Sequence, residues 1–205
     1  MEVRDFLEAV FQEDDGYLMS WFYHRATGKK KEAGFELRKN GIASLLHNAE
    51  QASARGWDCY YAPAVFKGPK RTKESFSHSN VLWADFDSGN GLPDFETAPS
   101  LVVQSSPGKY HVYWNLHNEI KDYSTLESLN KGIAYAFGAD KGGWDCVQLL
   151  RVPGTMNYKT EYGTPQPVML EQLNMVSYPI DKFSGFLVGN LTRNLAMALH
   201  PSAQS

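Results

Sequence analysis

Two aspartates, Asp85 and Asp87, stand one residue apart at the end of the apolar run 81–84. Successive side chains of a strand point to opposite faces, so both carboxylates share one face while Ala84 and Phe86 point into the core. Neighbouring negative charges repel, and a shared divalent cation or a proton relieves that repulsion. The pattern predicts the metal-binding pair of a phosphoryl- or nucleotidyl-transfer site. The simpler alternative is a strand that enters a polar turn with both carboxylates in solvent.

A hairpin with polar side chains follows. The sequence Ser105-Ser106-Pro107-Gly108 predicts a tight turn between strands 101–106 and 110–116. The backbone N–H groups of such a turn, with Lys109 and His111 beside them, are suited to bind a triphosphate. This is not a Walker A motif, because Val103 stands where the first glycine belongs and Tyr110 replaces the Ser or Thr. The alternative for His111 is an ordinary packed or exposed histidine.

A third segment runs from Asp145 to Lys159 and contains Arg151-Val-Pro-Gly-Thr. Asp145 and Arg151 have the same parity along a predicted strand over 146–151. With Asn157 and Lys159 they supply a third metal ligand and donors to phosphate. A structural salt bridge between Asp145 and Arg151 is the alternative. Asp140 is another carboxylate of this region, but its glycine-rich surroundings favour a turn.

Hydrophobic periodicity predicts the elements that hold these residues. Strands over 81–87, 101–106 and 110–116, followed by a helix over 124–137 and more strands, indicate an α+β sheet with helices on one face. The helix begins with a capping box, Ser124-x-x-Glu127, and ends at Gly138. The remaining predictions are helices 2–13, 42–55 and 183–199, strands 17–24, 57–66 and 167–173, and an exposed turn over 27–31. We expect an N-terminal α/β unit over 1–75, a catalytic module over 76–180, and a C-terminal helix and tail over 181–205.

Composition bounds the function. The chain has 205 residues and 42% apolar residues, enough for one or at most two compact units with a buried core. Its net charge of −3 means that nucleic acid must be bound by a local basic patch. The densest basic segment in the sequence consists of Lys67, Lys70, Arg71 and Lys73, which either contact a phosphate backbone or form a solvated loop.

The sequence predicts neither a zinc or disulfide site nor a membrane-spanning segment. The two cysteines, Cys59 and Cys146, are too few for a zinc finger or a disulfide scaffold, so we predict reduced, buried thiols and no zinc. No apolar stretch has the length needed to cross a bilayer, and the N-terminus is no signal peptide. We therefore expect a cytoplasmic protein without a membrane partner.

Taken together, the three segments resemble the archaeo-eukaryotic primase superfamily, specifically the primase-polymerase modules of phages and plasmids. The resemblance covers about residues 57–160. It implies an N-terminal α/β unit packed on a catalytic sheet shaped like an RNA-recognition motif. It also implies two divalent cations, Mg²⁺ or Mn²⁺, bound by Asp85, Asp87 and Asp145. Phosphates of the incoming nucleotide would contact His111 and the stretch from Arg151 to Lys159.

The resemblance implies a template-directed DNA primase and polymerase. Its partners would be nucleoside triphosphates, a single-stranded DNA template with its primer, and a replicative helicase. One departure concerns the family's Ser-x-His motif, because Lys109 stands where the serine belongs. Either Lys109 or Ser106 takes that role, with Ser105 beside them.

Two other functions are open to comparison. A replication-initiation nuclease needs two histidines flanking one apolar residue, and no His-x-His occurs in the sequence. A catalytically silent nucleic-acid-binding module is the second, although retained carboxylates would repel phosphates unless a metal intervenes.

Overall fold

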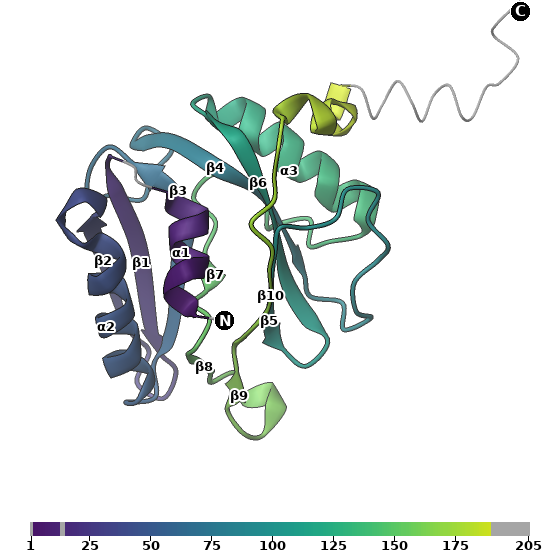
Figure 1. Cartoon of the computed structure of the whole chain (residues 1–205). Coiled ribbons are helices and arrows are strands. Elements are labelled where there is room, and N and C mark those ends of the chain that lie inside the picture. Colours follow the sequence, from purple (N-terminus) through teal and green to yellow (C-terminus); the bar gives the residue numbers. More distant parts are fainter. Residues whose placement is uncertain (1, 13–14, 190–205) are drawn as a thin grey trace, which may run out of the picture.

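The computed structural model describes residues 2–12 and 15–189 (Figure 1). Its strands follow the order β10-β5-β6-β4-β3-β1-β2, with β7 beside β3 and β11 beside β6. The strands are β1 Tyr17–His24, β2 Lys29–Glu36, β3 Asp58–Phe66, β4 Phe76–Phe86, β5 Leu101–Ser106, β6 Lys109–Ile120, β7 Leu150–Arg151, β10 Met169–Leu173 and β11 Ser177–Tyr178, while β8 Met156–Asn157 and β9 Gln166–Pro167 form a separate pair. The helices are α1 Val3–Phe11, α2 Gly41–Ser53 and α3 Tyr123–Phe137, with 3-10 turns η1 Leu37–Lys39, η2 Thr160–Tyr162 and η3 Ile180–Phe186. The predicted α+β class is confirmed.

Strand β4 connects two groups of strands. Its beginning pairs with β3, where Phe76 lies opposite Phe66, and the rest of it pairs with β6 up to Phe86 opposite Tyr110. We call β1, β2, β3 and β7 the N-terminal sheet, and β4, β5, β6 and β10 the second sheet. Figure 1 shows these as two walls with α1 between them. The end of β4 that carries Asp85 therefore belongs to the second sheet, whereas its beginning connects that sheet to the N-terminal one.

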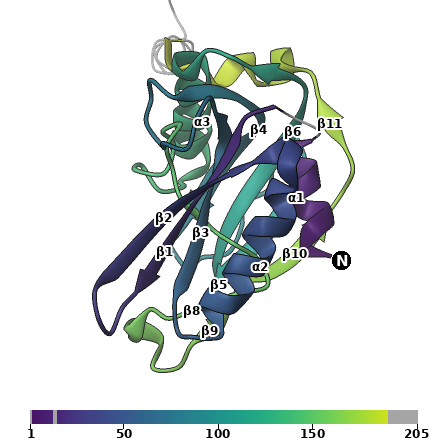
Figure 2. The same cartoon turned by 90° about the vertical axis from the view of Figure 1, so that its left-hand side faces the viewer.

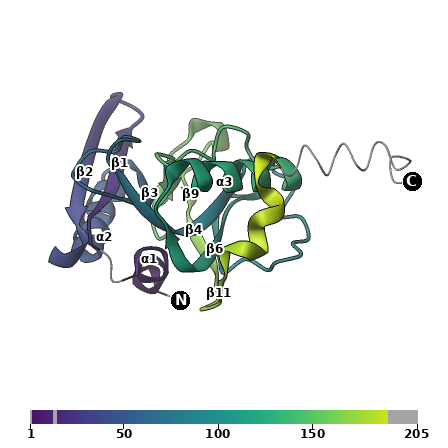
Figure 3. The same ribbon diagram turned by 90° about the horizontal axis from the view of Figure 1, so that it is seen from above.

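Helix α1 fills one side of the space between the sheets. Its Phe6 ring packs edge-on against Tyr61 of β3 at 6.1 Å and against Tyr113 of β6 at 5.5 Å between centroids. Phe6 is fully buried, and burial of a side chain of this size contributes about 1.5–3 kcal/mol. Figures 2 and 3 show α1 and α2 on the same side of the N-terminal sheet, whereas α3 lies along β4. Neither α1 nor α2 covers the opposite side of the N-terminal sheet.

Helix α3 begins differently from the prediction. Its N-cap is Asp122, whose carboxylate accepts hydrogen bonds from the backbone N–H groups of Ser124 and Thr125 at 3.3 and 3.0 Å. The predicted capping box is therefore wrong. Glu127 instead pairs with Lys73 at 2.7 Å and accepts the Cys146 N–H at 3.1 Å. The predicted end at Gly138 is confirmed, because this residue adopts a left-handed φ of 72°.

Several other boundaries also differ. The lysines of the predicted turn 27–31 begin β2, an edge strand, and edge strands tolerate lysine well. The predicted strand 146–151 shrinks to Leu150–Arg151, and the predicted strand 167–173 is divided between β9 and β10. Of the predicted helix 183–199, residues up to 186 form the end of η3, and 190–205 lie outside the described residues.

Two predictions about the core and the membrane can be compared directly. Cys59 and Cys146 are free and buried, as expected. Within residues 2–12 and 15–189, no helix is long and apolar enough to cross a membrane.

Candidate active site

The carboxylate pair lies at the end of β4. Ala84 and Phe86 are each 2% exposed, which confirms the predicted alternation. The side chain of Asp85 is 13% exposed, and Asp87, just beyond the strand, is exposed to solvent. Their charges interact, because Asp87 raises the pKa of Asp85. The structure therefore places the two carboxylates close enough at the end of β4 for their charges to interact.

The Asp85 carboxylate is buried, and one of its oxygens has no hydrogen-bond partner among the described residues. Burial raises its pKa to about 7, with further contributions from the negative charges of Asp87 and Asp140, while Lys159 and Arg151 oppose the shift. Its Oδ1 atom is buried and has no hydrogen-bond partner among the described residues. A buried oxygen of this kind costs about 1–3 kcal/mol, which a bound cation or a proton would recover.

His111 lies directly opposite Asp85 on β6. Its Nε2 is 3.6 Å from Asp85 Oδ1, too far for a hydrogen bond. Burial lowers the pKa of His111 to about 3, and the positive charges of Arg151 and Lys159 lower it further. The ring is therefore neutral near pH 7, and the contact with Asp85 is not an ion pair. Its Nδ1 also has no partner within the described part of the chain.

Arg151 reaches the site from the N-terminal sheet, where it lies opposite Tyr60 of β3. Its Nη1 donates to Asp58 Oδ1 at 2.6 Å, and its guanidinium lies 4.7 Å from the centre of the Tyr60 ring. The alternative of an Asp145–Arg151 salt bridge is therefore replaced by an Asp58–Arg151 pair. Arg151 Nη2 is buried and without a hydrogen-bond partner among the described residues.

Sequence reasoning missed Asp58 and Arg25. Asp58 is fully buried at the start of β3 and also pairs with Arg25 at 2.5 Å. Its Oδ1, which already accepts from Arg151, also accepts a hydrogen bond from the Tyr158 N–H at 2.9 Å. A single charged residue inside the predicted strand 57–66 was the available signal, because buried charges are seldom unpaired.

The segment from Asn157 to Lys159 is held by the hairpin. Asn157 is 1% exposed, and its Nδ2 donates to the Ser105 carbonyl at 3.0 Å. Its Oδ1 accepts the Lys159 N–H at 3.0 Å. Asn157 thus acts as a connector in this structure, and the residue it positions is Lys159, whose charge reaches both Asp85 and His111.

The hairpin's own polar groups have partners. Ser105 Oγ donates to the Lys109 carbonyl at 3.4 Å, and Ser106 Oγ is 2.8 Å from the Tyr162 hydroxyl. The Lys109 ammonium lies 3.4 Å from Glu161, and its pKa is raised by Tyr162 and by Asp87. Lys109 is therefore the hairpin residue whose charge acts on the carboxylate pair.

Asp145 occupies a different position from the predicted one. It lies outside any strand, so the parity argument with Arg151 does not apply. Its carboxylate accepts the Val147 N–H at 2.9 Å, and burial and Glu127 raise its pKa while Lys73 and Arg71 lower it.

Asp140 lies in the predicted turn, where its Oδ1 accepts the Gly142 N–H at 3.1 Å. Its own N–H donates to the Asp85 carbonyl at 2.7 Å. Nearby, Gly143 approaches so closely that an added Cβ would lie 3.2 Å from the Asp85 Cβ. The turn at 140–143 is therefore packed against the end of β4, and Asp140 is the third carboxylate whose charge acts on Asp85.

The basic segment is partly engaged within the protein. Arg71 pairs with Glu32 at 3.1 Å and donates to the Val147 carbonyl, while Lys73 pairs with Glu127. Lys67 and Lys70 are exposed. The structure thus divides the four predicted DNA contacts into two that support the fold and two that face solvent.

The carboxylate pair is the place in the described residues that we compare with the needs of a cation. Among the described residues, no group of three or more His, Cys, Asp or Glu side chains has the arrangement of a formed metal site. The buried, unpartnered oxygen of Asp85 beside Asp87 nevertheless suits a hard divalent cation, since Mg²⁺ and Mn²⁺ prefer carboxylate oxygens.

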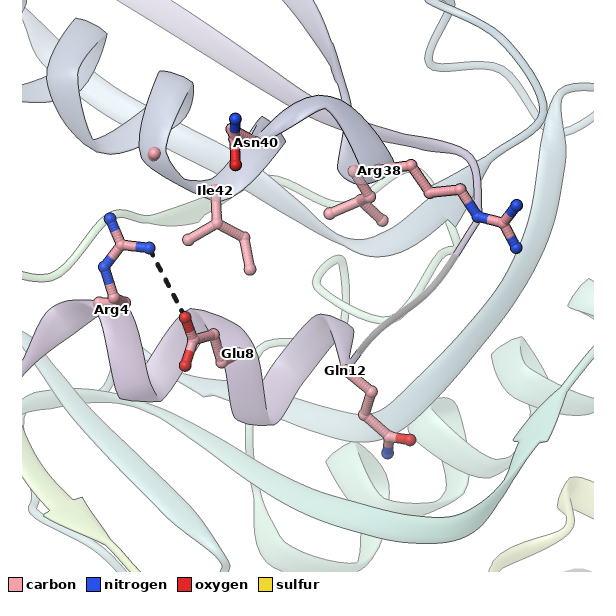
Figure 4. Close-up of a pocket in the computed structure, with 8 residues that line it drawn as sticks. Arg4, Glu8, Gln12, Arg38, Asn40 and Ile42 are labelled. Atoms are coloured by element: carbon pink, nitrogen blue, oxygen red, sulfur yellow. Dashed lines mark ion pairs between the residues drawn. The ribbon is translucent and has the colours of Figure 1, made fainter.

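A separate pocket lies between α1 and α2 (Figure 4). Arg4 and Glu8 on its wall pair with each other at 3.6 Å, and Arg38 pairs with Asp15. Its charged groups satisfy one another, and its lining includes none of the predicted site residues.

Comparisons with known proteins identify a family and similar folds. Residues 71–179, just over half of the chain, match the model of the RepB DNA-primase N-terminal domain family. Among solved structures, the primase-polymerase domain of cyanophage S-2L is similar with a TM-score of 0.67 and 12% identity, over 89% of this chain and 95% of that one. Primase RepB′ matches with a TM-score of 0.68 and 17% identity, over 99% of this chain and 67% of that one.

The catalytic domain of primase RepB′, in complex with initiator DNA, is also similar. Its TM-score is 0.63 with 19% identity, over 98% of this chain and 100% of that domain. At these identities the likeness concerns the fold. A comparison with curated protein sequences found no match.

Proposed function

The chain belongs to the family of RepB DNA-primase N-terminal domains, and on that premise we propose that it is the catalytic module of a template-directed DNA primase. The resemblance to archaeo-eukaryotic primases is confirmed by this family match and by the primase folds. In the proposed reaction, a 3′-hydroxyl on a single-stranded DNA template attacks the α-phosphorus of a nucleoside triphosphate, so that a phosphodiester bond forms, the α–β phosphoanhydride bond breaks and pyrophosphate leaves. Extension of the primer, as by a polymerase, belongs to the same proposal.

One observation carries the proposal. Among the described residues, three of the buried side-chain atoms without a hydrogen-bond partner belong to Asp85, His111 and Arg151, and others, such as those of Asn115 and Asn130, lie elsewhere in the fold. An unpaired buried polar atom needs an explanation, and three on neighbouring site residues are explained by a ligand that completes their hydrogen bonds. Asp85 can bind a metal cation, His111 can donate or accept a hydrogen bond, and Arg151 can bind a phosphate. A nucleotide that binds through metal cations needs all three kinds of group.

Asp85 and Asp87, with Asp145 as the third carboxylate, would hold two divalent cations, Mg²⁺ or Mn²⁺. Such ions activate the attacking hydroxyl and stabilise the charge of the phosphates. The chain's own contribution is to bring the carboxylates together on a rigid strand. Repulsion between Asp85 and Asp87 makes this site unfavourable until positive charge arrives.

The cationic residues would bind the triphosphate. Arg151 is fixed by Asp58 and has Nη2 available to donate to a phosphate oxygen. Lys159 adds positive charge beside Asp85, and Lys109 adds positive charge beside Asp87. Neutral His111 can donate one hydrogen bond without adding charge, which makes its role orientation of the nucleotide.

The test is incubation with single-stranded template, all nucleotides and either Mg²⁺ or Mn²⁺, with products sized on a gel. We expect primers from the wild type and none from Asp85→Asn or Asp87→Asn. Asp181→Asn, an exposed carboxylate on η3, is the matched control and should retain full synthesis. Thermal unfolding should show all variants folded.

The outcomes separate the alternatives. DNA binding without any synthesis by the wild type would identify a catalytically silent binding module. Cleavage of the template instead of synthesis would identify a nuclease. Near-normal synthesis by either carboxylate variant would remove the two-cation assignment.

A further inference from the structure

Three aromatic rings form a row on the N-terminal sheet. Trp21 and Tyr23 of β1 stack at 5.5 Å between centroids with planes 20° apart, and Trp21 lies 5.6 Å from Tyr60 of β3. Each of the three is partly exposed. We call Trp21, Tyr23 and Tyr60 the aromatic row.

The aromatic row lies on the side of the sheet away from α2. Phe22, between Trp21 and Tyr23, lines a pocket with Asn48 and Ala52 of α2. Successive side chains of a strand point to opposite faces, so Trp21 and Tyr23 point away from that helix. Their rings therefore remain available on the face that neither α1 nor α2 covers (Figure 3).

Positive charges accompany the rings. The Arg25 guanidinium lies 5.5 Å from the centre of the Tyr23 ring, and Arg151 lies 4.7 Å from that of Tyr60. Lys30 is opposite Tyr23 on β2 and is exposed. The carboxylates of Glu32 and Asp58 on this face are each paired with arginine. A chain with a net charge of −3 thus has more positive than negative side chains beside these partly exposed rings.

The row is continuous with the candidate active site. Arg151 packs on Tyr60 at one end of the row and acts on Asp85 and His111 of the site. Toward the β2 edge, the basic segment packs on the same face, because an added Cβ at Gly34 would meet Pro69 at 2.9 Å. A ligand on the row would therefore extend between the basic segment and the carboxylates.

We propose that the aromatic row binds the single-stranded DNA template, with bases stacked on the rings and phosphates near Arg25 and Lys30. The proposal rests on the proposed function and names the path of the template to that site. Aromatic rings interleaved with arginine and lysine are how proteins bind single strands without sequence preference, and each stacked base contributes about 1–3 kcal/mol. Rings and cations side by side match the bases and phosphates of a nucleic acid more closely than they match the surface of a protein partner.

The test is fluorescence anisotropy with a labelled oligothymidylate, in the absence of nucleotides and divalent metal. We expect Trp21→Ala and Tyr23→Ala each to weaken binding by about tenfold, in line with the stacking energy of one base. Trp21→Phe keeps a ring and should bind within about twofold of the wild type. Tyr135→Ala, which removes a tyrosine 53% exposed on α3, is the matched control and should bind as the wild type does.

Each result has a defined meaning. Wild-type affinity in Trp21→Ala and Tyr23→Ala, or no binding by the wild type, overturns the proposed template path. Equal losses in Trp21→Phe and Trp21→Ala also overturn it, because they would show a general structural effect instead of stacking. Primer synthesis measured on the same samples separates the two proposals. If the wild type makes no primers but the alanine variants still bind DNA more weakly, the proposed primase activity is contradicted and template binding by the aromatic row is supported.

Discussion

Asp58 and Arg151 form a buried ion pair that connects the beginning of β3 to the site, with Nη1 2.6 Å from Oδ1. Asp58 is fully buried and also pairs with Arg25. The pair holds the guanidinium through Nη1, while Nη2 has no hydrogen-bond partner among the described residues. We interpret Asp58 as a positioning residue, because it acts on the site through Arg151.

Replacing Asp58 by Asn should destabilise the fold strongly. The change leaves two arginines without their carboxylate, and breaking a buried pair in this way costs about 3–5 kcal/mol. Urea unfolding measures the loss. Arg25→Gln is the comparison: its side chain is 28% exposed, so a smaller loss is expected.

Asp58→Asn at wild-type stability would contradict the assignment of this pair. Arg151→Lys offers a second measurement, since lysine keeps the charge but lacks the planar fork. We expect Arg151→Lys to raise the KM for the nucleotide more than it lowers kcat. A purely structural role for Arg151 would not affect KM selectively.

The sequence allowed local features to be predicted better than distant ones. The bounds of β1 and β5 were predicted correctly, because aromatic residues in β1 and valines in β5 favour strands and turn signals bound both segments. The start of α3 was not, since Asp122 and Ser124 are both good caps and only geometry selects between them. The pairing of Asp58 with Arg151 joins residues 93 positions apart, and no local pattern encodes such a contact.

The same distinction applies to the site. The proximity of Asp85 and Asp87 could be predicted from their spacing at the end of a strand, and their charges do interact, although β4 ends at Phe86. The place of Asp145 depended on a strand over 146–151, but the chain there is largely irregular because Val147 and Gln148 bond back to Asp145. Predicting this required the tertiary contacts of Glu127 and Arg71.

The third carboxylate can be assigned by comparing Asp145→Asn with Asp140→Asn. We expect the Asp145 variant to lower nucleotide incorporation by at least about 100-fold, as for a ligand of a catalytic metal. Asp140 is occupied in its turn by the Gly142 N–H, so its variant should lose less than about tenfold. Single-turnover incorporation at saturating metal measures both. The reverse order would transfer the third position to Asp140.

The cap of α3 should be visible in stability. Asp122→Ala should lower the free energy of unfolding by about 1 kcal/mol, because two backbone N–H groups lose their acceptor. Ser124→Ala is the control and should cost less, since the Ser124 side chain is a partner of Asp122 and not the cap itself.

The same carboxylate predicts a pH dependence. Hydrogen bonds from Ser124 and Thr125 lower the pKa of Asp122 to about 2, below its unfolded value of 3.8. Its stabilisation is therefore complete above about pH 4 and is lost as the pH falls through about 2. The difference in stability between wild type and Asp122→Ala should shrink over that range. A constant difference would mean that the charged form is not what caps the helix.

The two thiols should be unreactive in the folded protein. Burial raises the pKa values of both Cys59 and Cys146 to about 12, so almost no thiolate exists at pH 8. Labelling with iodoacetamide should be slow in buffer and reach both thiols in urea. Fast labelling of the folded chain would show that one of these side chains is exposed in solution.

The basic segment should separate into two functional halves. Arg71 and Lys73 pair with Glu32 and Glu127, so replacing both by Gln should reduce stability modestly, by about 1 kcal/mol or less, as for partly exposed pairs. Lys67 and Lys70 are exposed, so replacing both by Gln should leave stability unchanged. It should instead lower affinity for single-stranded DNA and reduce the dependence of binding on salt, because each phosphate contact releases a counterion.

Anisotropy titrations of both double variants at several salt concentrations, together with urea unfolding, test this division. The matched control is the double variant Lys29→Gln with Lys31→Gln. Both lysines are exposed on β2, and because side chains alternate along a strand they lie on the opposite face from Lys30. If Lys67 and Lys70 contact the template, only their replacement changes the salt slope. A slope equal to that of the wild type would mean that these lysines are simply solvated and that the template reaches the carboxylates without them.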